Sequence, residues 1–580
     1  MSCILITMIK MPCSHYSTEY GDKYISRSSK QEAIRKIVRQ TTGHLPHVLI
    51  NTTTGRLCNR AEQGSTFESL PIFTELVSSM TTRINYVRIK REVRQYFRYV
   101  MLSHTWEDNE PLFEKVVGIM VTELEESLSH DKLRMFCEIV GKAGFNWAWS
   151  DTCCINKSDP SVLQEALVAM FKWYEGSAMM IVFLRGVRSS SQRGALAGSK
   201  WNTRGWTLQE YFAAKVICFY TEDWTLYLDL ELPNHKESPD VIWEMEQATG
   251  VSAQQLMALR PGIGGIREKL CLASTRQTTR VEDAAWSLLG IFSVTGIIPA
   301  YGEEERTLGL LLANVLARSR DVSILAWTGE SGRYNSCFPA HITVFNQPET
   351  SHLPPPIQDA EMERITTSHS SSFDLDVALK LYDCIDKLPS PLFAANRMEL
   401  PSITFQLPSF SARRTPSGRV YRANTRAFGM VEITTRYDLS RMKSLYLVHP
   451  WLDTLMEREE VQSGIFVEDD VMPPPSPNTD DEEICDEEIH DDSSSWLLPE
   501  PESPSLLTSV RMVSMDRETR ARRLVARLRQ PFGALLVTLA STGRRAAYKR
   551  VAADSMITVR FQENVSLAEL LDNVRTIDVL

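Results

Sequence analysis

Between residues 99 and 220, short apolar runs alternate with segments in which apolar residues recur at helical spacing. The four runs have the length of buried strands and cover residues 99–103, 146–150, 178–184 and 216–220. Strands that alternate with helices are typical of a mostly parallel sheet with helices packed on its faces. The pattern therefore predicts an α/β fold for this part of the chain.

Local signals place helices between these strands. Asp131 is expected to cap one helix, and Asp159 to cap the next, with a proline at the first helical position. A third helix is expected to begin near Gly205. Past the fourth run the pattern becomes mainly helical, and residues 279–282 form a predicted capping box for a further helix.

With 580 residues, the chain is too long for one hydrophobic core. We expect, in chain order, a partly disordered lead-in (1–95), the α/β domain (96–225), a helical extension (226–345), a β-rich unit (346–465), an acidic, proline-rich disordered insert (466–510) and a segment that completes the β-rich unit (511–580). The insert contains four consecutive acids, Asp480 to Glu483, and too little apolar surface to offset its ordering entropy.

Composition excludes several classes of function. The formal net charge of −10 argues against general nucleic-acid binding, which selects for clustered Lys and Arg. No window approaches the ~18 consecutive apolar residues of a membrane-spanning helix. The eleven cysteines are scattered and odd in number, so their spacing predicts neither a disulfide framework nor a metal site. We therefore expect a soluble cytoplasmic protein.

Three sequence blocks occur in a recognisable order: Tyr99 to Trp106, Trp149 to Ile155 and Arg204 to Glu210. Together they resemble the HET domain, the heterokaryon-incompatibility module of fungi. A weaker resemblance continues through residues 278–283, 299–303 and 324–327. Many members have glycine after the tryptophan that ends the first block, whereas this chain has Glu107, so its loop is more acidic.

The resemblance implies a role in nonself recognition and programmed cell death, with protein partners or self-association of the HET domain as the mode of signalling. The HET domain is itself distantly similar to Toll/interleukin-receptor (TIR) domains, so the resemblance implies a TIR-like or flavodoxin-like sheet. Some TIR domains cleave NAD with a glutamate at the position of Glu210. Enzymatic cleavage of NAD by Glu210 is therefore the alternative function, with NAD as substrate rather than bound cofactor.

The same blocks define a candidate site. Because the carboxyl ends of parallel strands deliver side chains to one crevice, a catalytic Glu210 would lie near five ligand-binding residues: Ser103, His104, Trp106, Asp151 and Trp206. Trp206 and Glu210 are four residues apart on one expected helix, so they should share a face.

Two other interpretations of these residues stay open. In a structural one, Arg204 and Glu210 form an ion pair, Trp206 belongs to the core, and His104 is a satisfied interior histidine. In a hydrolase, a cysteine of the pair Cys153 and Cys154 would be the nucleophile, although burial on a strand would raise the thiol pKa.

Overall fold

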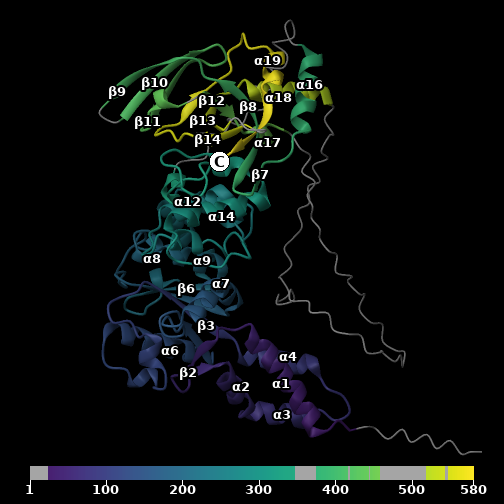
Figure 1. The fold of residues 1–580 in the computed structure, drawn as a ribbon. Coiled ribbons are helices and arrows are strands. Elements are labelled where there is room, and N and C mark those ends of the chain that lie inside the picture. The colour runs from purple at the N-terminus through teal and green to yellow at the C-terminus, as the bar shows by residue number, and fades with distance from the viewer. Residues whose placement is uncertain (1–23, 347–373, 416–417, 443, 457–516, 542–545) are drawn as a thin grey trace, which may run out of the picture.

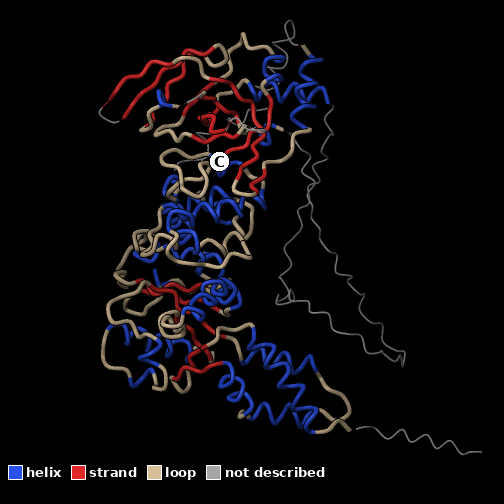
Figure 2. The backbone as a smooth tube through the Cα atoms, viewed as in Figure 1, coloured by secondary structure: helices blue, strands red, loops and turns tan. Residues whose placement is uncertain are grey.

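The computed structural model describes residues 24–346, 374–415, 418–442, 444–456, 517–541 and 546–580. The predicted disordered insert at 466–510 lies outside these residues. Strands gather in two regions that a mostly helical stretch separates, and a helical arm extends from the first of them (Figures 1 and 2). The mixed α/β character expected from the sequence is confirmed.

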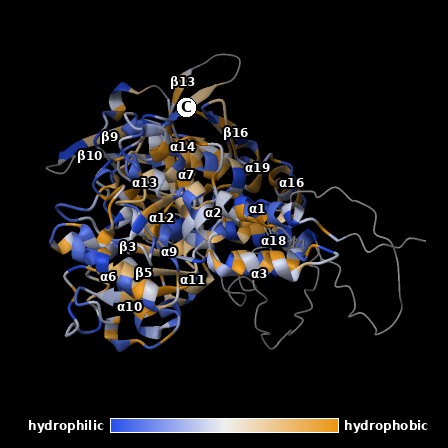
Figure 3. Cartoon of the chain, turned by 90° about the horizontal axis from the view of Figure 1, so that it is seen from below, coloured by the Kyte–Doolittle hydropathy of each residue, from blue (hydrophilic) through white to orange (hydrophobic). Residues whose placement is uncertain are grey.

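Within the described residues before 96, a helical arm stands where the sequence predicts a partly disordered lead-in. It contains four helices and one hairpin: α1 (Arg27–Gly43), β1 (Val48–Asn51), β2 (Arg56–Asn59), α2 (Arg60–Glu68), α3 (Pro71–Ser79) and α4 (Tyr86–Tyr96). Helix α1 buries Ala33, Ile34, Ile37 and Val38, a spacing that places them on one face. Figure 3 shows hydrophilic and hydrophobic residues together along α1 and α3.

The sequence prediction failed here because polar residues that look like loops are helix caps. The Ser26 side chain accepts a hydrogen bond from the backbone of α1, and Asn59 forms a full capping box with Glu62 at the start of α2. These residues begin helices rather than interrupt them.

One six-stranded sheet organises the first half of the chain, with the order β2-β1-β4-β3-β5-β6. Its last four strands are β4 (Trp147–Ser150), β3 (Tyr99–His104), β5 (Met179–Leu184) and β6 (Ile217–Thr221), and neighbours among them are parallel. The hairpin β1–β2 adds two antiparallel strands beside β4. Because β4 and β5 lie on opposite sides of β3, the order of the parallel strands reverses at β3.

The helices around the sheet follow the local signals with one correction. Helix α7 (Pro160–Gly176) is capped by Asp159 as predicted. Helix α6 (Leu128–Lys142) begins earlier than expected, because Ser127 rather than Asp131 accepts the capping hydrogen bond. The connection from β5 to β6 contains α8 (Lys200–Thr203) and α9 (Gly205–Ala213), and α5 (Phe113–Val116) follows β3.

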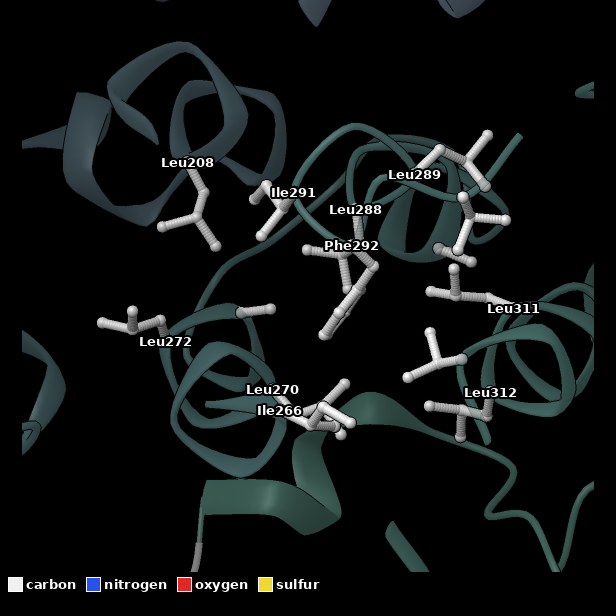
Figure 4. Packing of buried hydrophobic residues seen from close by; sticks show 14 of the residues in the cluster. Leu208, Ile266, Leu270, Leu272, Leu288, Leu289, Ile291, Phe292, Leu311 and Leu312 are labelled. Carbon is white, nitrogen blue, oxygen red and sulfur yellow. The ribbon is translucent and has the colours of Figure 1, made fainter. Parts of the chain in front are cut away.

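A helical region follows the sheet and shares a core with α9. Its helices are α10 (Pro239–Thr249), α11 (Ala253–Ala258), α12 (Ile266–Ser274), α13 (Asp283–Trp286) and α14 (Glu304–Ser319). Figure 4 shows Leu208 of α9 facing this core beside Leu272 and Ile291. The predicted capping box at 279–282 is wrong, because the Glu282 carboxylate instead accepts from the backbone N–H of Gly302 at 2.7 Å.

The C-terminal region contains two sheets. A three-stranded sheet joins β9 (Phe410–Thr415), β10 (Gly418–Thr425) and β11 (Gly429–Thr435). A larger sheet has the order β12-β13-β14-β16-β8-β7, and β15 pairs with β13. Its strands are β7 (Leu392–Ala394), β8 (Arg397–Gln406), β12 (Leu445–His449), β13 (Phe532–Ser541), β14 (Ala547–Arg550), β15 (Ile557–Val559) and β16 (Val574–Val579).

The larger sheet closes on itself, because β12 pairs with β8 as well as with β13. Among the described residues of this region, four helices accompany it: α16 (Leu375–Asp386), α17 (Leu452–Leu455), α18 (Arg517–Leu528) and α19 (Leu567–Asp572). Strands from both sides of residues 457–516 therefore belong to one sheet. No helix within the described ranges is long and apolar enough to span a bilayer.

Candidate functional site

The end of β3 supplies two neighbouring residues to two different polar clusters. Ser103 and His104 are consecutive in a strand, so their side chains point to opposite faces of the sheet. Ser103 meets Glu210 of α9, and His104 meets Asp151, which follows β4. We call these groups the Glu210 cluster and the Asp151 cluster.

The Glu210 cluster is sealed inside the protein. Ser103 donates a hydrogen bond from Oγ to Oε2 of Glu210, and Trp201 donates from Nε1 to Ser103 Oγ at 2.7 Å. The hydroxyl of Tyr174 donates to the backbone carbonyl of Leu102 at 3.3 Å and lies near the Glu210 carboxyl. Glu210 is only 8% exposed, and Ser103 and Trp201 are buried. The direct donor to this carboxyl is therefore a neutral hydroxyl.

Burial raises the pKa of Glu210 to about 7, and the negative charge of Asp151 acts in the same direction. The hydrogen bond from Ser103, the positive charge of Arg204 and the nearby Tyr174 hydroxyl oppose this shift without cancelling it. Among the described residues, Arg204 and Glu210 do not form an ion pair, so the direct contact of the structural interpretation is not found. Near neutral pH this carboxyl is therefore partly protonated.

Helix α9 is fixed against the helical region by a close backbone approach. The Gly205 N–H donates to the carbonyl of Gln277 at 2.8 Å, and a Cβ atom at position 205 would collide with Cγ2 of Thr278. Two residues before Glu210, Leu208 packs into the helical core (Figure 4). The helix thus anchors one side on the helical region and presents Glu210 to β3.

The Asp151 cluster is more open and carries charge. His104 Nε2 lies 3.2 Å from Asp151 Oδ1, and the indole N–H of Trp106 donates to Oδ2 at 2.8 Å. Lys157 donates to the backbone carbonyl of Asp151 at 2.6 Å, and its ammonium lies 3.8 Å from the centre of the Trp106 ring. Arg204 approaches the same ring at 5.7 Å.

Opposing effects set the charge of Asp151. Burial disfavours its ionised form, but the Lys157 ammonium and the hydrogen bond and charge of His104 outweigh burial. The pKa of Asp151 therefore lies well below its usual range. This carboxylate is ionised under conditions in which Glu210 is partly neutral.

A chain of ion pairs continues from His104 across the same edge of the sheet. His104 Nδ1 lies 3.8 Å from Oε1 of Glu110, and Glu110 pairs with the buried ammonium of Lys132. Glu107 lies 3.6 Å from Lys132 and pairs with Arg185 at 2.6 Å. The acidic loop after β3 is therefore neutralised by cations from α6 and from the end of β5.

Comparison with known proteins identifies the region that contains β3 and the residues of the Asp151 cluster from His104 to Lys157. Residues 99–197 match the family model described as Heterokaryon incompatibility protein (HET). The chain carries a HET domain. It is similar to the Vegetative incompatibility protein HET-E-1 of Podospora anserina, with 31% identity over 205 residues, which is 34% of this chain and 14% of that relative. The match thus spans about a seventh of the relative's length, and no solved structure matches.

Five of the six predicted site residues fall into the two clusters, and Trp206 does not. The Trp206 side chain instead lies beside the Asp283 carboxyl of the helical region and acts to lower its pKa, although Trp206 shares α9 with Glu210. The aromatic partner of the Ser103–Glu210 pair is Trp201, which the sequence analysis missed. No local period singles out Trp201, since its partner Ser103 is distant in the chain.

Other interpretations of the HET domain lose support from the geometry. Cys153 and Cys154 lie in the turn after β4 rather than on the strand, and both are buried. Burial raises the pKa of the Cys154 thiol well above its usual value, which disfavours a thiolate nucleophile. Within the described ranges, no group of His, Cys, Asp and Glu residues could hold a metal ion.

Two cavities of the described structure lie outside both clusters. One is lined by Gly205, Arg276 and Thr278, behind α9. The other lies in the C-terminal region around Trp327 and Arg550. Neither is lined by Ser103, Asp151 or Glu210, which agrees with the burial of the Glu210 carboxyl.

Proposed function

We propose that this protein acts in vegetative incompatibility and that its HET domain transmits a cell-death signal through protein contacts, by self-association or by binding a partner. The likeness to a relative named as a vegetative incompatibility protein supports the biological role. The mode of action rests on one observation, the closure of the Glu210 cluster: Glu210 is 8% exposed, and its carboxyl accepts from the buried Ser103.

The closed cluster suits a structural role because each of its members fixes another. Trp201, Ser103 and Glu210 join α8, β3 and α9 through hydrogen bonds. A substrate would have to displace these contacts to reach Glu210. In our proposal the HET domain works from the cytoplasm as a rigid signalling unit, and the C-terminal β-rich region senses the trigger or restrains the HET domain.

A second candidate is TIR-like cleavage of NAD. Ser103 and Glu210 meet where the order of the parallel strands reverses, which is the place where open α/β sheets bind ligands. A carboxylate there could stabilise the oxocarbenium-like state that forms as nicotinamide leaves. This candidate requires α8 or α9 to move, so that the carboxyl becomes accessible and ionised.

The proposal is tested by expressing full-length Glu210→Gln in fungal cells that the wild-type protein kills. Glutamine keeps an oxygen that can accept from Ser103, so a contact mechanism predicts killing at the wild-type level. Ser103→Ala, which removes that donor, serves as a matched probe of the same contact. Loss of killing by Glu210→Gln at equal protein level and melting temperature would contradict the proposal.

Self-association is tested separately by sedimentation of the purified chain over a wide concentration range. Assembly that grows with concentration, together with killing that rises steeply with expression, is the expected result. A chain that stays monomeric at every concentration while still killing cells would require a different partner protein.

A further inference from the structure

The helical arm has a charge opposite to that of the whole chain. Residues 24–98 contain thirteen Lys and Arg residues, five Glu and no Asp, which gives a formal charge of +8, whereas the full chain carries −10. Like charges that stay together on one folded unit create a local positive field even in an acidic protein. Although the net charge of the chain is negative, the surface of the arm is therefore expected to attract anions.

The far end of the arm is also unusually apolar. The backbone N–H of Ile25 donates to the carbonyl of Thr81 at 3.0 Å, which joins the residues before α1 to the loop before α4. At this end Tyr24 is 77% exposed, Tyr86 49% and Val87 79%. We call these three residues the arm tip. Figure 1 shows the ends of α1 and α4 on the part of the arm that projects from the sheet.

Basic residues surround the arm tip on the exposed side of α4. Lys90 and Arg91 lie three and four residues after Val87, so they share its helix face, while Ile89 and Val93 are buried against the arm. Arg83 is exposed in the loop before the helix. Arg91 pairs with the adjacent Glu92 at 2.9 Å, an exposed pair that leaves its charge largely available to other anions.

From this arrangement we propose that the arm tip and its basic rim dock on the surface of an anionic phospholipid bilayer. Tyrosine suits the headgroup level, and a valine exposed at the end of a helix can enter the boundary with the acyl chains. Arg83, Lys90 and Arg91 would face lipid phosphates and carboxylates. The inference does not depend on the proposed function of the Glu210 cluster.

A nucleic acid is the less suitable partner for the same surface. A phosphate backbone would use the basic rim, but an aliphatic side chain as exposed as Val87 gains nothing from it. Helix α4 also leads directly into β3, which carries Ser103 and His104. Docking by the arm would thus hold the HET domain close to the bilayer.

The test measures co-sedimentation of the full-length protein with vesicles of phosphatidylcholine alone or mixed with phosphatidylserine. We expect binding at least about tenfold stronger to the anionic vesicles, and its loss at high salt. The variant Arg83→Glu/Lys90→Glu/Arg91→Glu should reduce this binding about tenfold or more. A matched control, Arg413→Glu/Arg414→Glu on the exposed strand β9, should leave it unchanged.

A second variant separates lipid from other polyanions. Tyr86→Ser/Val87→Ser keeps every charge and changes exposed side chains, so the melting temperature should stay the same while vesicle binding falls several-fold. No preference of the wild type for anionic vesicles would overturn the proposal. It would also be overturned if the β9 control lost as much binding, or if the serine variant bound vesicles normally and wild type bound single-stranded RNA equally well.

Discussion

The two clusters at the end of β3 differ in how they accommodate a carboxyl group. In the Glu210 cluster the acid accepts from the neutral Ser103 hydroxyl, which itself accepts from the Trp201 indole, and burial raises the pKa of Glu210 to about 7. The Asp151 cluster surrounds its acid with Lys157, His104 and the Trp106 indole, and the pKa of Asp151 lies below its usual range. Ser103 and His104 are consecutive in β3, yet Ser103 contacts a carboxyl that is partly protonated near neutral pH and His104 contacts one that is ionised.

The difference shows which kind of change each cluster tolerates. A neutral cluster depends on hydrogen bonds and shape, so an uncharged isostere can replace its acid. A charged cluster depends on matched partners, so removal of one ion leaves another buried without compensation. Variants of the two clusters should therefore respond in opposite ways.

The largest effect is expected for Lys132→Met. The Lys132 side chain is buried and pairs with the buried Glu110. Its loss leaves the Glu110 carboxylate buried without its ammonium partner. We expect this to lower the free energy of unfolding by about 3–5 kcal/mol, measured as a lower melting temperature. The double variant Lys132→Met/Glu110→Met should recover most of the loss. Equal melting of the single variant and wild type would contradict the mutual dependence of the ion pairs that continue from the Asp151 cluster.

Glu210→Gln should change stability in a pH-dependent way. Because the folded-state pKa of Glu210 is raised from 4.5 to about 7, its contribution is fully present at acid pH and is lost as pH rises through 7. Glutamine does not titrate, so its contribution to stability does not fall as the pH rises. The stability difference between variant and wild type should therefore move by ~2–3 kcal/mol in favour of the variant from pH 4 to pH 8. A constant difference in melting temperature across this range would refute the raised pKa.

The smallest expected contrast compares the same substitution in both clusters. Trp201→Phe removes a buried donor to Ser103 and leaves a small void, which should cost ~2 kcal/mol or more. Trp106→Phe removes a donor to Asp151, but Trp106 is 39% exposed and water can replace the bond, so we expect ~1 kcal/mol or less. Thermal unfolding of the two variants side by side measures the contrast. A larger loss for Trp106→Phe would reverse the assignment of sealed and open clusters.

Features with short-range causes could be predicted from the sequence. Asp159 and the proline after it mark the start of α7 through contacts within one helical turn. The same logic misplaced the start of α6, because Ser127 and Asp131 are both acceptable caps and only packing decides between them. In the arm, the polar residues Ser26 and Asn59 resembled loops because caps and loops share a composition.

Contacts across long stretches of chain were predictable only where strand topology dictates them. Ser103 and Glu210 were expected together because parallel strands end at one edge, and they do contact each other. The burial of Glu210 and the role of Trp201 depend on how α8 and α9 pack over β3, which no local pattern encodes. For the same reason the sequence placed Trp206 with Glu210, whereas the structure places its side chain beside Asp283.

The most direct test of a sealed, contact-making HET domain is a measurement of nicotinamide release. Purified full-length protein is incubated with NAD at concentrations that permit assembly, beside Glu210→Gln. Our account predicts no turnover above the protein-free rate for either chain, because the Glu210 carboxyl is buried among Ser103, Trp201 and Tyr174. Turnover by the wild type that disappears in Glu210→Gln would contradict it and establish the TIR-like alternative.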